Sequence, residues 1–240
     1  MDEVRGAFKP ILWDLPRGGG NPYLCQTWFP GGHINVGGGN LDNIKETPAA
    51  DREQLANLSF AWMVDRIQPY LAIDFDAVKA QFDAVKGLDK MQSVSGGVIK
   101  RYVSPLYAVI AGGLKPRTPG HYHNNDTTYT VERIHPSVYF RQQWNRHQSG
   151  IGCLDGAIYQ PEALKGWSRE YVDDGSHDRR GWVWRKRDKS GAFDPADELW
   201  EFQIGEMPRE RSAERLLFEN SWDSIFLREV DEGWREEAED

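Results

Sequence analysis

The chain has 240 residues, of which 39% are hydrophobic and 12% aromatic, so it can build a packed core and is not a disordered chain. Its formal net charge of −8 argues against a nucleic-acid partner, which requires a concentrated positive surface. Cys25 and Cys153 make no disulfide framework, and no transmembrane run or secretory signal is recognisable. We therefore expect an intracellular, cytoplasmic protein without a transmembrane segment.

The first half of the chain predicts one short strand and two helices. A β-prone run over residues 23–29 predicts the strand. Apolar residues at helical spacing predict a helix over residues 52–70, with Asp51 as its N-cap. A second apolar stripe predicts a helix over residues 74–85, which Gly87 can end.

The second half is harder to divide into elements. Residues 91–151 are rich in glycine and proline and are expected to be mostly loop, with a short helix or strand over residues 133–144. Alternating apolar and polar residues predict a hairpin that pairs residues 181–186 with residues 199–204. Helical periodicity returns over residues 211–229.

One histidine is placed as in an enzyme. In QTWFPGGHINVGGGN, residues 26–40, His33 stands between the predicted strand and three consecutive glycines. An α/β-hydrolase carries its catalytic histidine on a loop just beyond the last strands of its sheet, and small residues let such a loop turn sharply. A histidine after a strand is more often structural, so spacing alone leaves both interpretations open.

The surrounding residues resemble a known family. TWFPGGHINVGGG followed by LANLSFAWMVDRI is similar to the signature of the type VI secretion lipase-effector-like catalytic domain family, α/β-hydrolases that include bacterial phospholipase effectors and uncharacterised fungal proteins. The resemblance covers about residues 5 to 70, and RTPGHYH and IHPSV resemble the tails of fungal members. The matching positions are Trp28, Phe29, Pro30, Gly31, His33, Gly37 to Gly39, Leu58, Ala61, Trp62 and Met63.

This resemblance implies a fold, a site and a substrate. The fold class would be α/β: a partial α/β-hydrolase (last strand, histidine loop and following helix) over residues 1–71, then a fungal-type, irregular α+β region over residues 72–240. His33 would be the general base, acting on a lipid or acyl-ester substrate without a metal or cofactor. The residues implied to shape or support its loop are Gly31, Gly32, Asn35, Gly37, Gly38 and Gly39.

The chain departs from the family pattern twice. The family aspartate two residues after the histidine is Asn35, which carries no charge to support an imidazolium. More importantly, no serine lies in a Gly-x-Ser-x-Gly elbow. The nearest match, Ser168, follows Gly166 but fails at Glu170, and it comes after His33 in the chain. We therefore expect a truncated hydrolase whose nucleophile half is missing and which is inactive alone.

Two other stretches of the sequence could form binding sites. His121 and His123 are two residues apart, so on a strand their side chains would lie on the same face and could bind one metal ion. Further ligands at suitable spacing are missing, which favours surface hydrogen bonding. The basic, aromatic stretch over residues 179–187 could meet nucleic acid or anionic lipid, but interleaved aspartates favour a hairpin held by local ion pairs. The alternative function is a non-catalytic binding or scaffold protein derived from the hydrolase family.

Overall fold

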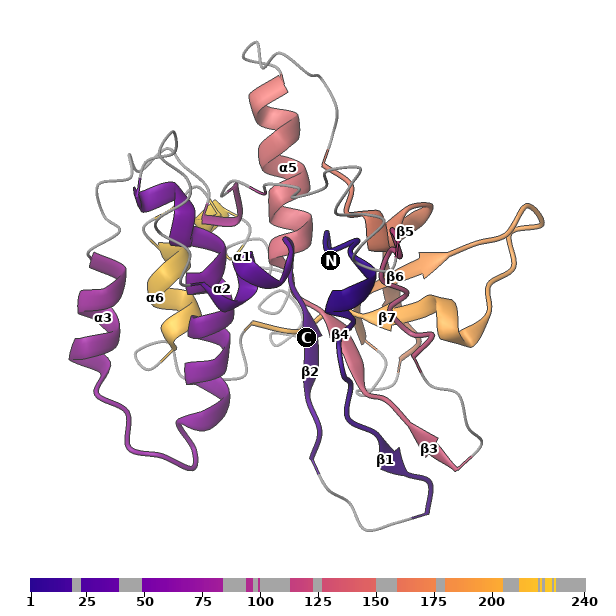
Figure 1. Cartoon of the computed structure of the whole chain (residues 1–240), viewed down its shortest axis with the longest axis horizontal. Coiled ribbons are helices and arrows are strands. Elements are labelled where there is room, and N and C mark those ends of the chain that lie inside the picture. The colour runs from indigo at the N-terminus through magenta and orange to yellow at the C-terminus, as the bar shows by residue number, and fades with distance from the viewer. Residues whose placement is uncertain are drawn as a thin grey trace. The chain divides into compact units, whose positions relative to one another are not determined.

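A computed structural model describes the chain, and its elements are labelled in Figure 1. The described residues are 1–18, 23–38, 49–83, 94–96, 99, 113–122, 127–149, 159–175, 180–204, 212–219, 221, 223–225 and 227. The chain divides into two compact units that interleave along the sequence. The first comprises Met1–Gly32, Arg101–Pro136 and Gln160–Gln203, and the second comprises His33–Lys100, Ser137–Tyr159 and Ile204–Asp240.

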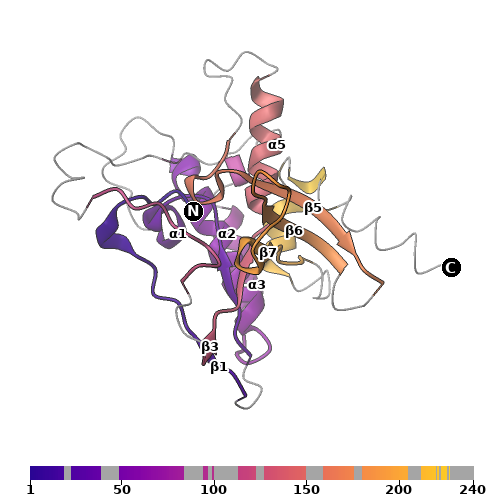
Figure 2. The ribbon, with the colours of Figure 1, turned by 90° about the vertical axis from the view of Figure 1, so that its right-hand side faces the viewer.

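The first unit contains all the described strands. They are β1 (Leu15–Pro16), β2 (Gln26–Trp28), β3 (Thr128–Tyr129), β4 (Glu132–Ile134), β5 (Trp167–Asp173), β6 (Arg180–Lys186) and β7 (Glu198–Trp200), with short 3-10 turns at η1 (Gly6–Phe8), η3 (Glu162–Leu164) and η4 (Pro195–Asp197). β1 pairs antiparallel with β3, β2 pairs parallel with β4, and β5, β6 and β7 form an antiparallel sheet. The three strands of that sheet lie side by side in Figure 2.

The predicted strand at residues 23–29 is confirmed as β2, and its partner comes from about a hundred residues further along. The indole Nε1 of Trp28 donates to Oε2 of Glu132 at 2.8 Å, and the backbone N–H of His135 donates to the Trp28 carbonyl at 2.9 Å. The His135 ring stacks between Phe29 and Phe202. This packed aromatic layer makes β4 part of the core of the first unit.

The predicted hairpin is also confirmed, since β6 pairs with β7 in the register Val183 opposite Trp200. β5 was not predicted, because its sequence WSREYVD mixes charged and aromatic residues and lacks an apolar face. Its charged residues instead find partners on the neighbouring strands, as described below.

The second unit is helical. Its elements are α1 (His33–Gly37), α2 (Ala49–Ile67), α3 (Phe75–Asp83), η2 (Val94–Gly96), α5 (Ser137–Ser149) and α6 (Ala213–Glu219). The apolar stripe of α2 is buried at Leu55, Leu58, Ala61 and Trp62. α2 also holds α6: the Asp65 carboxylate accepts hydrogen bonds from the Ser212 hydroxyl and from the backbone N–H groups of Ala213 and Glu214 at 2.6–3.1 Å.

Two predictions about α2 need correction. α2 begins at Ala49, so Asp51 lies inside the helix and is not its N-cap. Met63, one of the apolar residues of the predicted helix, is 48% exposed. The short helix or strand expected over residues 133–144 is confirmed by β4 and α5, although α5 continues to Ser149, beyond the predicted end. The helix predicted over residues 74–85 is confirmed as α3, with Asp74 as its N-cap.

Candidate functional site

The segment around His33 is a strand, a turn and a short helix. β2 ends at Trp28, and His33 is the first residue of α1. Gly31 lies in the turn with a φ of 96°, a left-handed conformation that favours glycine. His33, expected on a loop, thus begins a helix directly after the turn that follows a strand.

The turn is held by the first residues of the chain. The Asp2 carboxylate accepts from the backbone N–H of Gly31 at 2.7 Å, and the Asp2 N–H donates to the Gly31 carbonyl at 3.0 Å. The Met1 amino group donates to the carbonyls of Phe29 and Gly31 at 2.9 and 2.8 Å. The position of the turn is therefore fixed by a buried polar cluster.

Glycine also ends α1. The N–H of Gly38 donates to the Ile34 carbonyl at 2.9 Å, and Gly38 has a φ of 69°, so it closes the helix as a left-handed C-terminal residue. A Cβ on Gly38 would lie 3.2 Å from Cβ of Ala56 in α2. The Ser59 hydroxyl of α2 donates to the Val36 carbonyl at 2.6 Å. Together these contacts seat α1 on α2.

The predicted site residues do not share one environment. His33 is exposed, whereas Asn35 is buried, as expected for residues two apart, which point to opposite sides of a helix. Gly31 and Gly32 lie in the turn, Gly37 is the last residue of α1, and Gly39 lies outside the described residues. Of the predicted glycines, Gly31 and Gly38 have positive φ values, while the His33 imidazole is exposed and Asn35 lies on the packed side of α1.

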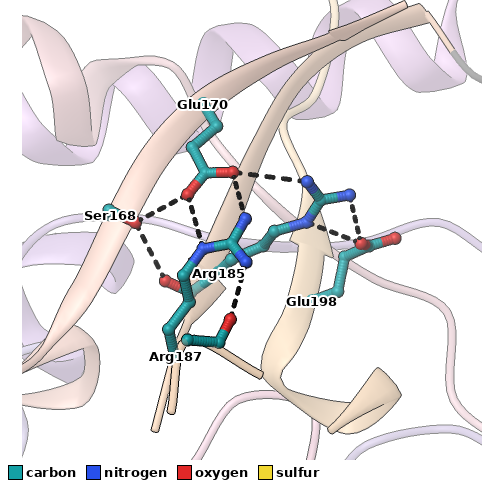
Figure 3. Close-up of polar contacts among 6 residues, drawn as sticks. Ser168, Glu170, Arg185, Arg187 and Glu198 are labelled. Carbon is teal, nitrogen blue, oxygen red and sulfur yellow. Dashed lines mark hydrogen bonds and ion pairs between the residues drawn. The ribbon is translucent and has the colours of Figure 1, made fainter. Parts of the chain in front are cut away.

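Ser168, the nearest sequence match to a nucleophile, lies in a different kind of place. It is on β5, a regular extended strand, whereas a nucleophile elbow is a sharp turn from a strand into a helix. Its hydroxyl donates to Glu170 at 3.1 Å and to the Arg185 carbonyl at 3.4 Å (Figure 3). Ser168 thus belongs to a polar network of the sheet.

That network is a chain of ion pairs across three strands (Figure 3). Glu170 pairs with Arg187 at 2.8 Å and with Arg185 at 3.3 Å, and Arg185 also pairs with Glu198 at 2.6 Å. The hydrogen bonds from Arg187 are the main reason that the pKa of Glu170 is lowered to about 2. The prediction of an ion-paired hairpin is confirmed. The acidic partners in this network are glutamates, whereas aspartates were expected.

The GHYH stretch is held by a hydrogen bond. Nε2 of His121 lies 2.7 Å from Oδ1 of Asp197 in η4, while His123 lies outside the described residues. Within the part of the chain that the structure describes, no group of three His, Cys, Asp or Glu residues could hold a metal ion. The surface hydrogen-bonding role expected for His121 is therefore observed.

No helix among the described residues is both long enough and apolar enough to cross a bilayer.

A comparison with known protein families gives a match at the start of the chain. The model of the family described as T6SS, Phospholipase effector Tle1-like, catalytic domain matches residues 1–66, which include β2, the glycine turn, α1 and nearly all of α2. No curated protein and no solved structure matches the chain. The resemblance noted in the sequence is thereby confirmed over residues 1–66, which are similar to the Tle1-like phospholipase effector catalytic domain.

Proposed function

We propose that residues 1–71 are the C-terminal portion of an α/β-hydrolase catalytic domain that cleaves a lipid or acyl ester, with His33 as the general base. Residues 72–240 would form an accessory C-terminal region. The observation that carries the proposal is the position of His33, an exposed imidazole one turn after β2, inside the segment matched by a phospholipase effector catalytic domain.

The direction of the strands supports this role. β2 and β4 run parallel, and His33 follows the carboxyl end of β2. In α/β sheets, functional residues gather beyond the carboxyl ends of the strands. The turn that precedes His33 is anchored through Gly31 and Asp2, which limits the freedom of the chain that carries the imidazole.

In the proposed reaction, the imidazole of His33 takes the proton of a serine hydroxyl as the serine oxygen attacks the acyl carbonyl. The imidazolium then returns that proton to the departing alcohol, and water releases the acyl group by the reverse sequence. The sequence has no Gly-x-Ser-x-Gly elbow. The serine must therefore come from outside these 240 residues, so the chain is expected to be inactive alone.

A second candidate is a non-catalytic scaffold derived from the same family. Half of a hydrolase sheet would leave the edge of β2 unpaired, and an exposed apolar edge promotes aggregation. Here Gln26, Thr27 and Trp28 pair with Glu132, Arg133 and Ile134 from the chain's own later region. This self-pairing favours a unit that folds without the nucleophile half.

The deciding experiment combines the intact mass of the protein from its natural source with labelling by a fluorophosphonate probe, which reacts with activated serines. A labelled species with a mass well above the 27.5 kDa of this chain supports the hydrolase. His33→Ala in that species should then lower turnover about a hundredfold or more. His121→Ala, which removes another exposed histidine, should leave turnover unchanged. An unlabelled species with the mass of this chain would refute the hydrolase and favour the scaffold.

A further inference from the structure

Three large apolar side chains near the start of the chain are exposed. Ile11 is 93% exposed, Trp13 is 75% exposed and Tyr23 is 74% exposed, whereas Phe29 nearby is buried. We call these three residues the apolar patch. All three lie in the first unit and inside the family-matched segment. Clustered exposed apolar residues usually mark a surface that contacts something.

The backbone that carries the apolar patch is held in place. The side-chain amide of Gln26 in β2 clamps Trp13: the Trp13 N–H donates to Oε1 at 2.7 Å, and Nε2 donates to the Trp13 carbonyl at 3.0 Å. Tyr23 precedes Gln26 by three residues, which span about 10 Å of extended chain. The clamp thus brings residues 11–13 and residue 23 to the same region, and Figure 1 shows β1, which follows Trp13, beside β3.

The size of the apolar patch indicates what covers it. Three such side chains offer about 500 Å² of apolar surface, at roughly 150–200 Å² each. A stable protein interface buries about 800 Å² on each partner, so the apolar patch is too small for a dimer by itself. A lipid surface has no such minimum, because each inserted side chain contributes independently. Tryptophan and tyrosine are also the residues that favour the headgroup region of a bilayer.

The charges around the apolar patch fit a phospholipid headgroup. Lys9 and Arg17 are exposed on either side of residues 11–13, and Arg17 lies over the Tyr129 ring at 5.7 Å. Asp14 is the acidic residue between them. Two cations can meet lipid phosphates, while the net charge of −8 opposes binding to an anionic membrane. The charge pattern therefore selects a zwitterionic surface.

We propose that the apolar patch docks the protein on a zwitterionic phospholipid bilayer, with Ile11, Trp13 and Tyr23 inserted among the headgroups. This inference rests on the proposed function, since a lipid ester substrate is presented in such a surface. It gives a role to three exposed residues that the chemistry of His33 does not use.

The test is flotation of the 240-residue protein with vesicles of ether-linked phosphatidylcholine, which cannot be hydrolysed at an acyl ester. The wild type should float with the vesicles, and Ile11→Ser with Trp13→Ser should weaken binding about tenfold or more. The matched control is Tyr70→Ser with Leu71→Ser, which removes two exposed apolar residues after α2 and should leave binding unchanged. Thermal melts should show that both double variants fold as the wild type does.

A second variant tests how the tryptophan is presented. Gln26→Ala keeps the apolar patch but removes the clamp, so vesicle binding should fall severalfold while Trp13 remains. Wild-type protein that stays with the unbound fraction, or equal losses in the patch and control variants, would overturn the proposal. So would light scattering that shows a dimer dissociated by the patch variants. Vesicle binding lost through the patch variants would leave this inference standing even if the protein from its natural source stayed unlabelled by the fluorophosphonate probe, which would refute the hydrolase alone.

Discussion

The two faces of the β5–β6–β7 sheet hold the same chemical pair, a glutamate with an arginine, in opposite environments. On one face Glu170 and Arg187 are 29% and 39% exposed; on the other Arg169 and Glu201 are 9% and 4% exposed. Residues 169 and 170 are neighbours in β5, so their side chains point to opposite faces. Comparing the two pairs separates the attraction between the charges from the free energy lost when the charged groups are desolvated.

The pKa values of the two glutamates show the difference. Hydrogen bonds from Arg187 lower the pKa of Glu170 to about 2. Burial raises the pKa of Glu201, even though Arg169 lies 2.6 Å away and opposes that change. Desolvation outweighs attraction on the buried face, while attraction outweighs desolvation on the exposed face.

The largest expected effect comes from breaking the buried pair. Arg169→Ala leaves Glu201 as a buried carboxylate without its cation and removes the guanidinium stacked 3.7 Å over the Trp182 ring. We expect the free energy of unfolding to fall by about 3–5 kcal/mol, measured by urea denaturation. Replacing both partners, with Arg169→Met and Glu201→Leu, should recover most of that loss. A double variant as unstable as the single one would contradict the desolvation argument.

The dependence of stability on pH sharpens the comparison, because the two glutamates contribute slopes of opposite sign. Glu170 has a lowered pKa, so its contribution to stability is present above pH 4.5 and is lost as the pH falls toward 2. Glu201 has a raised pKa, so its contribution falls as the pH rises above 4.5. Denaturation from pH 2 to 7 should show that Glu170→Gln removes part of the acid-induced loss of stability. Glu201→Gln should remove a term of the opposite sign.

The smallest effect is expected on the exposed face. Arg187→Ala removes the Glu170 pair from a position that water reaches, and its arginine is the more exposed partner. The free energy of unfolding should change far less than in Arg169→Ala, because water screens the pair and Arg185 still contacts Glu170, and the change should shrink further in high salt. The control is Lys165→Ala, which removes the 2.9 Å ion pair between an exposed lysine and Glu162 and should also have a small effect. A loss near that of Arg169→Ala would show that exposure does not govern these pairs.

The elements that could be predicted are those whose residues repeat with a regular apolar period. The stripes of α2 and α3 and the alternation in β6 and β7 are local patterns, and each predicted an element that the structure contains. β5 was missed because it has no apolar face. α5 was expected only as a short helix or strand over residues 133–144, because its buried residues Val138 and Phe140 lie among mostly polar neighbours.

The candidate site also has features that the sequence predicted and features that it did not. The motif around His33 was recognisable from residue types at fixed spacing, and the family match covers it. The sequence did not predict that α1 starts at His33 or that Asn35 is buried, because both depend on contacts with α2. The docking of Trp13 by Gln26 joins residues thirteen apart through side-chain hydrogen bonds that no periodicity reveals.

The sequence by itself determined the short-range features: an aromatic-rich, acidic chain, the strand before His33, the main helices and the resemblance to a phospholipase effector domain. Only the tertiary structure decided that β2 pairs with β4 and that Asp65 holds α6. It also decided that Arg169 is buried on one face of the sheet while its neighbour Glu170 is more exposed on the other. These features join residues up to about 150 positions apart, and their energies depend on burial, which the order of residues does not encode locally.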